Sequence, residues 1–106
     1  MSDVVLYERQ NGHSPFADWF DALDRQAAAK VTIAVERLRL GNFSSIKSVG
    51  SGVLECRIDW GPGYRLYFGR DGENLVILLI GGTKQRQGED IARAKQHWAD
   101  YKRRKV

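Results

Sequence analysis

Several residue types that carry common chemistries are scarce in this 106-residue sequence. Cys56 is the one cysteine, so no disulfide can form within the chain, and His13 and His97 are the two histidines. Without a cluster of thiols and imidazoles at metal-ligand spacing, we expect no metal site and no cofactor. No apolar run approaches the roughly 20 residues that cross a bilayer, and the N-terminus lacks a secretory signal pattern. We therefore expect a cytoplasmic protein that does not contact membranes.

The sequence is otherwise that of a soluble globular protein with an excess of positive charge. Its composition, 42% hydrophobic and 28% charged, is typical of folded domains and not of disordered chains. The length suits one domain with one core, so we treat residues 1–106 as a single domain. The net charge of +4 makes a polyanion or an acidic protein a natural partner.

The first half of the chain predicts one strand and two helices. Residues 4–7 form a short apolar run that ends in a polar turn. Ser14 and Pro15 are a good N-cap and first helical residue, and they start a helix that runs to about Ala22. Residues 24–40 form a second helix with one apolar stripe, so the two helices make a hairpin that covers one face of a sheet.

The middle of the chain predicts a β-hairpin with one apolar face and one charged face. In residues 53–60 and 64–68 the even positions are apolar, and charged or polar residues lie between them. In an antiparallel pair, the residue numbers of any two facing residues add to the same sum. The apolar residues of both strands have even numbers, so they share a face only if that sum is even, which requires a turn with an odd number of residues. The simplest such turn is residues 61–63. It predicts these cross-strand pairs: Asp59 with Arg65, and Arg57 with Tyr67.

The end of the chain predicts a central strand and a final helix. Residues 75–80 are apolar on both faces, as expected of a strand that is covered on each side. A helix follows from about Gly88, and residues 41–52 read as a polar loop. The predicted order is β-α-α-β-β-β-α, an α+β domain in which a mainly antiparallel sheet packs against an N-terminal helix hairpin and a C-terminal helix.

The polar face of the hairpin is the candidate site. Its arginines, Arg57 and Arg65, lie near Lys84 and Arg86 after the last strand, and such a group of cations suits a phosphate. In metal-free RNA cleavage, arginines would stabilise the negative charge on the phosphoryl oxygens, and a lysine would exchange a proton. Tyr67 would orient or stack a base. The competing interpretation is a solvated sheet face with ordinary cross-strand ion pairs.

Four segments of the sequence carry a family resemblance: residues 16–20, 54–58, 61–68 and 78–91. Together they resemble the RelE/ParE toxin superfamily, and in particular its addiction-module killer proteins, also described as phage Gp49-like or HigB-like toxins. The most specific signals are the Gly-Pro-Gly turn joined to Tyr-Arg and the Gly-Gly-x-Lys before the last helix. The resemblance covers nearly the whole chain and implies the RelE-like fold.

The resemblance also implies an activity and partners. It implies the toxin of a type II toxin-antitoxin module, held inactive by a cognate antitoxin that is often a helix-turn-helix DNA-binding protein. Many RelE-like toxins are metal-independent endoribonucleases that cleave mRNA on the ribosome and arrest translation. By this resemblance Arg57, Arg65 and Lys84 are the catalytic residues, and we expect RNA contacts from Lys47, Tyr67 and Arg86. The general base stays open between Lys47 and Lys84.

Two other functions fit the same resemblance. ParE-like members of the superfamily are non-catalytic inhibitors of DNA gyrase, and such a protein would act through exposed helical surfaces. An inactive remnant would have no toxicity. Mapping of cleaved transcripts and of DNA supercoiling separates these possibilities.

Overall fold

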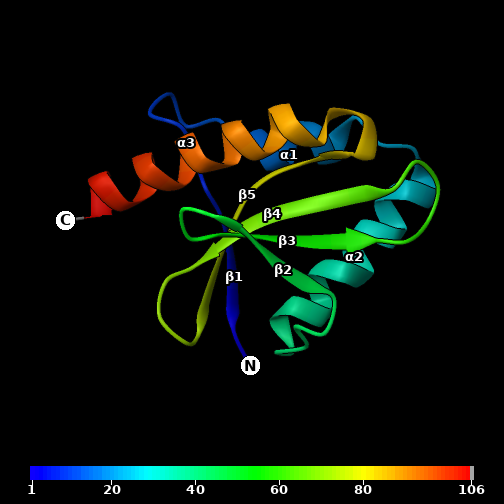
Figure 1. Cartoon of the computed structure of the whole chain (residues 1–106), viewed down its shortest axis with the longest axis horizontal. Coiled ribbons are helices and arrows are strands. Elements are labelled where there is room, and N and C mark those ends of the chain that lie inside the picture. Colours follow the sequence, from blue (N-terminus) through cyan, green and yellow to red (C-terminus); the bar gives the residue numbers. More distant parts are fainter. Residues whose placement is uncertain (106) are drawn as a thin grey trace.

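One five-stranded sheet with helices on both faces forms the core of the protein (Figure 1). The computed structural model describes residues 1–105. Its elements in chain order are β1 (Asp3–Leu6), α1 (Pro15–Asp21), α2 (Arg25–Arg39), β2 (Ile46–Gly50), β3 (Val53–Ile58), β4 (Tyr64–Arg70), β5 (Leu75–Thr83), the 3-10 turn η1 (Lys84–Arg86) and α3 (Gln87–Lys105). The predicted α+β class is confirmed, with one strand more than expected.

Both helices of the N-terminal hairpin begin at the predicted caps. The Ser14 hydroxyl accepts a hydrogen bond from the Ala17 amide at 3.1 Å, and the Asp24 carboxylate accepts one from the Ala27 amide at 2.8 Å. Each cap satisfies one amide that has no partner within its own helix. The stripe of α2 that the sequence predicts as apolar is buried, and Val31 and Leu38 are at its centre.

The strand order is β1-β5-β4-β3-β2, with β1 parallel to β5 and all other pairs antiparallel. The apolar segment of β5 lies between two strands and is buried on both faces, as its composition predicts. Residues of one face pack against α1 and α2, and residues of the other face pack against α3. Within residues 1–105, no helix is long and apolar enough to cross a membrane.

The additional strand is β2, which the sequence analysis assigned to a loop. It is an edge strand that pairs only with β3, and among its residues only Ile46 and Val49 are half-buried. The turn that follows contains Ser51 with a φ of 57°, the one residue other than glycine with a positive φ in the described chain. The sequence analysis missed this strand because serine and glycine surround it and resemble a loop. An edge strand needs few apolar residues, so β2 lacks the apolar alternation that marks the other strands.

The register of the β3–β4 hairpin differs from the expected one by two residues. Arg57 lies opposite Arg65, and Glu55 lies opposite Tyr67. The loop runs over residues 59–63 and not 61–63, because the Trp60 amide donates to the Ile58 carbonyl and the Gly63 amide donates to the Trp60 carbonyl, so residues 59 and 60 belong to the turn. Gly61 and Gly63 take left-handed φ values of 58° and 77° within it. Five residues is still an odd number, so the predicted sharing of one face by both arginines is correct.

Candidate functional site

The three residues expected to be catalytic lie together at one end of the sheet. Arg57 and Arg65 face each other across β3 and β4. Lys84 follows β5 at the start of η1. A Cβ atom at Gly63 would lie 3.2 Å from Arg65 Nη1 and 3.4 Å from Lys84 Cβ, so both residues border Gly63. The fold therefore brings three cations from three segments to one place.

Arg65 is the most buried of these cations, with 5% of its surface exposed. Its Nη1 donates to the Gly63 carbonyl at 2.8 Å. Its Nε lies 3.8 Å from the Glu55 carboxylate, which is an ion-pair distance but too long for a hydrogen bond, and this Nε has no hydrogen-bond partner in the described chain. Because arginine stays charged when buried, this site holds a fixed cation with an unused donor.

Glu55 organises the polar groups beneath the site. Only 4% of this residue is exposed, and its Oε2 accepts hydrogen bonds from the Tyr67 hydroxyl at 3.0 Å and from Gln87 Nε2 at 2.8 Å. Gln87 is the first residue of α3, so this contact ties the helix to β3. The sequence placed Glu55 on the correct face but gave no sign of Gln87, because the two residues are far apart in the chain.

Tyr67 cannot take the role in base stacking that we expected. The residue is fully buried, with 0% of its surface exposed. Burial, together with the neighbouring Glu55 carboxylate, raises the pKa of its phenol strongly. The ring packs in the core under α3 and offers no face to a nucleobase. Its hydroxyl donates a hydrogen bond to the Glu55 carboxylate within the core. The expected contact of Tyr67 with RNA is therefore wrong.

The remaining expected RNA contacts, Lys47 and Arg86, are exposed. Lys47 lies on β2 opposite Glu55. Arg57 is two residues after Glu55 on β3, so Lys47 is displaced from Arg57 by about 7 Å along the strand direction. Arg86 forms an ion pair with Glu89 at 2.9 Å at the start of α3. Lys47 therefore lies on the same face of the sheet as the arginine pair, and Arg86 lies after the end of β5.

A buried carboxyl group that the sequence did not reveal lies next to Arg65, on the face of the sheet that α3 covers. Asp90 is 4% exposed, and a Cβ atom at Gly82 would lie 1.8 Å from its Oδ2. Gly82 is the β5 partner of Arg65, so only a glycine there leaves room for this carboxyl. Oδ2 has no hydrogen-bond partner in the described chain, and burial raises the pKa of Asp90. In the sequence Asp90 reads as an ordinary acid in the first turn of a helix.

No group of three His, Cys, Asp or Glu side chains within residues 1–105 is placed to hold a metal ion. The groups that gather at this end of the sheet are instead guanidinium, ammonium and carboxyl groups around Arg65. Such an arrangement can bind an anion with planar, forked donors and can exchange protons at its rim.

Comparisons with known proteins place this chain in a family. Residues 18–99 match the family described as Phage derived protein Gp49-like (DUF891). An uncharacterized protein of Haemophilus influenzae is 47% identical over 81 residues, which is 76% of this chain and 82% of that protein. The match contains β2 to β5, η1 and most of α3, and so all the candidate site residues. The chain therefore belongs to the phage-derived Gp49-like family, a family of RelE-like toxins.

Proposed function

We propose that this protein is the toxin of a type II toxin-antitoxin module and that it arrests translation as a metal-independent endoribonuclease acting on mRNA at the ribosome. The observation that carries the proposal is the pairing of Arg57 with the buried Arg65 beside Lys84. Like charges placed directly opposite each other destabilise a sheet, so this pairing suits a site whose ligand supplies the missing negative charge. Its partners would be mRNA, the ribosome and a cognate antitoxin, in this proposal a helix-turn-helix DNA-binding protein.

The proposed reaction is attack of the ribose 2′-oxygen on the adjacent phosphorus. The new O–P bond forms as the bond from phosphorus to the 5′-oxygen breaks, which yields a 2′,3′-cyclic phosphate and a free 5′-hydroxyl. Arg57 and Arg65 would bind the non-bridging oxygens and stabilise the negative charge that grows on them. The buried position of Arg65 strengthens that interaction, because solvent screens it less.

Two protons move in this reaction, one from the 2′-hydroxyl and one to the 5′-oxygen. Lys84 and Lys47 are the candidates for these transfers, and both are exposed at the rim of the arginine pair. The Lys84 Cβ atom and Arg65 Nη1 both border Gly63, which supports a role for Lys84 beside the arginine pair. We assign Lys84 to the leaving 5′-oxygen and Lys47 to the attacking hydroxyl or to RNA contact.

The proposal is tested by mapping RNA ends after the purified protein acts on a defined mRNA, with and without ribosomes. Arg57→Ala and Lys84→Ala should each lower the cleavage rate about a hundredfold, the usual loss when one group that stabilises the transition state is removed. Both residues are exposed, so the thermal midpoint should hardly change. Arg25→Ala, an exposed arginine at the start of α2, is the matched control and should cleave at the wild-type rate.

Two outcomes would contradict the proposal. Growth arrest that persists in Arg57→Ala and Lys84→Ala, with intact transcripts, would exclude the nuclease. A change of DNA supercoiling in cells with intact RNA would instead favour inhibition of DNA gyrase.

A further inference from the structure

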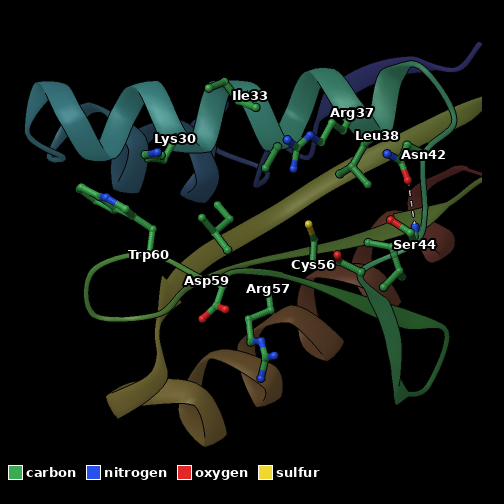
Figure 2. Close-up of a pocket in the computed structure, with 14 residues that line it drawn as sticks. Lys30, Ile33, Arg37, Leu38, Asn42, Ser44, Cys56, Arg57, Asp59 and Trp60 are labelled. Atoms are coloured by element: carbon green, nitrogen blue, oxygen red, sulfur yellow. Dashed lines mark hydrogen bonds between the residues drawn. The ribbon is translucent and has the colours of Figure 1, made fainter.

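The arginine pair belongs to a row of three facing residues across β3, β4 and β5. Arg57 faces Arg65, and Arg65 faces Gly82. Figure 2 shows Arg57 pointing from β3 away from α2, so the row lies on the face of the sheet that α3 covers. Facing residues have Cβ atoms about 4.5–5.5 Å apart, but a glycine contributes no side chain to the third position of the row.

The carboxyl group of Asp90 fills that third position. A Cβ atom at Gly82 would lie 1.8 Å from Asp90 Oδ2 and 2.7 Å from its Cγ, so the carboxyl occupies the place of the missing side chain. At the usual cross-strand spacing, Oδ2 then lies within about 7 Å of the Arg65 Cβ atom. Helix α3 therefore supplies an acid to a row in which the sheet itself provides two cations.

Arg65 and Asp90 each keep an unused hydrogen-bonding atom. In the described chain, Arg65 Nε and Asp90 Oδ2 are buried without a hydrogen-bond partner, and the two residues are 5% and 4% exposed. A buried donor or acceptor without a partner costs stability, and such atoms are rare in folded proteins. Here a donor and an acceptor of this kind lie side by side in one row, and they are complementary.

Glu55 is the ion-pair partner of Arg65, but the carboxylate oxygen nearer to the guanidinium is already occupied. Its Oε2 lies 3.8 Å from Arg65 Nε and accepts hydrogen bonds from the Tyr67 hydroxyl at 3.0 Å and from Gln87 Nε2 at 2.8 Å. A carboxylate oxygen has two lone pairs, so a third hydrogen bond to Oε2 would weaken one of the others. Asp90 Oδ2 has no such competing donor in the described chain.

We propose that Asp90 is a positioning residue for the arginine pair. Its carboxylate accepts a hydrogen bond from Arg65 Nε and so fixes the plane of the guanidinium while the terminal nitrogens bind a phosphate. In the structure, Nη1 donates to the Gly63 carbonyl at 2.8 Å. A phosphate that takes over Nη1 turns the guanidinium, and Asp90 sets the orientation in which it stops. The inference rests on the proposed function, because the phosphate is that of the RNA.

The competing interpretation is an acid that only stabilises the start of α3. Asp90 and Glu89 both lie in the first turn of this helix, where negative charge is favourable. Glu89 differs in its surroundings, since its side chain is 69% exposed and pairs with Arg86 at 2.9 Å. Changing either acid to its amide removes one carboxyl group from the same turn. Glu89→Gln is therefore the matched control for Asp90→Asn.

Cleavage of a defined mRNA by the purified protein tests the role of Asp90. Asp90→Asn should lower kcat about tenfold or more, because a misoriented guanidinium stabilises the transition state less, and KM should change less than about threefold. The thermal midpoint should stay equal or rise, because the variant removes a buried acid with an unpartnered oxygen. Glu89→Gln should cleave at the wild-type rate. A merely structural role predicts lower stability and an unchanged kcat in the folded variant.

The NMR signal of the Arg65 Nε–H group reports the contact without any cleavage. It is recorded in the free protein and with inorganic phosphate from about pH 8 to pH 4, and its absence in Arg65→Lys assigns it. In the wild type and in Glu89→Gln the signal should shift as Asp90 takes up a proton. In Asp90→Asn that shift should disappear, because the amide does not titrate.

The comparison with Asp90→Asn is needed because other charged groups lie near this carboxyl. Burial raises the pKa of Asp90, and two arginines of η1 and α3 oppose that rise. The charged and titratable groups around it come from β3, β4, η1 and α3: Glu55, Arg65, Tyr67, Arg86, Glu89 and Arg93. All of them are present in both proteins, so the difference between the two titrations belongs to Asp90.

Gly82→Ala tests the position of the carboxyl independently. The added methyl group would overlap Asp90 Oδ2, so the carboxyl must leave the row, and both the thermal midpoint and kcat should fall. In an Asp90→Ala background the methyl group takes the space of the carboxyl, and Gly82→Ala should then lower the midpoint much less. Gly88→Ala, with nothing within 4 Å of the added Cβ, is the control in both backgrounds.

Several results would overturn the inference. These are an unchanged kcat in Asp90→Asn, an equal loss in Glu89→Gln, the same pH response of the Nε–H signal in Asp90→Asn and wild type, or additive effects of Gly82→Ala and Asp90→Ala. If the wild-type protein cleaves no RNA, the nuclease is excluded, and the Nε–H signal still decides whether Asp90 holds Arg65. If the wild type is active and Asp90→Asn cleaves equally well, this inference alone is overturned.

Discussion

At the scale of single residues, the arginine pair depends on Glu55 for its place in the fold. Arg57 and Arg65 face each other directly, and the nearest compensating charge is the buried Glu55 carboxylate, 3.8 Å from Arg65 Nε. That carboxylate also accepts two hydrogen bonds, one of them from Tyr67. Removing one partner of such a buried group leaves the others without partners, and each orphaned polar group costs stability.

Tyr67→Phe separates support of the site from contact with RNA. The substitution removes one hydrogen bond to Glu55 and keeps the buried ring, so we expect a loss of about 1 kcal/mol in the free energy of unfolding. Cleavage of mRNA by the folded variant should stay within a few-fold of wild type, because the ring does not reach the surface. Urea unfolding and end mapping check the two parts. A hundredfold loss of cleavage in a stable Tyr67→Phe protein would contradict this placement of Tyr67.

Glu55→Ala should be much more harmful than Tyr67→Phe. It leaves Arg65, the Tyr67 hydroxyl and Gln87 without their shared acceptor, and we expect a loss of about 3 kcal/mol or more. Urea unfolding of Glu55→Ala measures this loss. Glu36→Ala, which removes an exposed ion pair with Arg39 on α2, is the matched control and should change stability little. Equal stabilities of the two variants would show that the buried network contributes nothing.

Gly69 and Gly88 provide a pair of substitutions with opposite expected signs. A Cβ atom at Gly69 would lie 2.4 Å from the Trp98 ring, so Gly69→Ala should lower the free energy of unfolding by about 1–3 kcal/mol through overpacking. Gly88 lies in the first turn of α3 with nothing within 4 Å of an added Cβ, and Gly88→Ala should leave stability equal or raise it by up to about 1 kcal/mol. Thermal or urea unfolding of the two variants, side by side, measures both signs. A neutral Gly69→Ala would mean that α3 can move away from the sheet at low cost.

At the scale of elements, α3 is the part whose docking shapes the site. Its first residue holds Glu55, and its C-terminal half is tied to the sheet by two carboxylates. Asp100 accepts a hydrogen bond from the Tyr7 hydroxyl at 2.6 Å, and Asp71, in the turn between β4 and β5, accepts from Tyr101 at 2.7 Å. The Tyr7 hydrogen bond lowers the pKa of Asp100, and hydrogen bonds from Lys105 and then from Tyr101 lower the pKa of Asp71. Burial together with Asp71 raises the pKa of Tyr101 to about 12. The helix is therefore fastened at both ends.

The docking of α3 should weaken in mild acid through His97. Burial lowers the pKa of this imidazole, and the nearby Arg9 and Arg93 lower it further, while Asp100 opposes them; its ring stacks on Tyr7 at 4.9 Å. The unfolded chain then binds a proton more readily than the folded protein, so stability is full above the unfolded pKa of about 6.5 and falls as pH drops through the folded pKa.

Urea unfolding at about pH 7.5 and pH 5 measures this effect. The wild-type protein should lose stability between the two conditions, and His97→Gln should lose less, because the variant has no imidazole to protonate. His13→Gln, in an exposed loop, is the matched control and should follow the wild type. Identical pH dependence in His97→Gln and the wild type would place the titration elsewhere.

At the scale of the whole molecule, the two faces of the sheet separate two kinds of surface. The arginine pair is on the side of α3, and a groove between α2 and β3, bordered by Lys30 and Arg37, is on the side of α2, with β3 contributing residues to both. A net charge of +4 attracts polyanions to the protein as a whole, and the position of the cations decides where they stay.

RNA binding should therefore weaken with salt, and Arg57 should contribute to the slope. Between 50 and 200 mM salt we expect a linear fall of log K with log salt concentration, and Arg57→Ala should reduce the slope by about 0.7 for a single strand. Arg25→Ala should leave the slope unchanged, since Arg25 is exposed on α2 away from the site. Titration of a labelled single-stranded RNA at several salt concentrations measures the slopes. Equal slopes for Arg57→Ala and wild type would exclude a phosphate contact at Arg57.

Local patterns were sufficient for much of this architecture. Helix caps at Ser14 and Asp24, the two-sided apolar character of β5 and the alternation in the hairpin each depend on residues close together in the chain. The alternation of apolar and polar residues placed Arg57 and Arg65 on one face. That prediction stayed correct despite a two-residue error in the strand register, because the predicted and the observed loops both have an odd number of residues. The family resemblance then raised one polar face to a candidate site.

What the sequence by itself determined is the set of α-helices and strands other than β2, and the shared face of Arg57 and Arg65. What only the tertiary structure decided is what covers each face: α3 buries Tyr67 and brings Gln87 to Glu55, and the approach of α3 to Gly82 buries Asp90. Periodicity records that a face is polar or apolar, but it does not record which distant segment packs on it. For this reason the arginines could be named from the pattern, whereas the network around Arg65 includes the contact of Gln87 with Glu55, which are 32 positions apart in the chain.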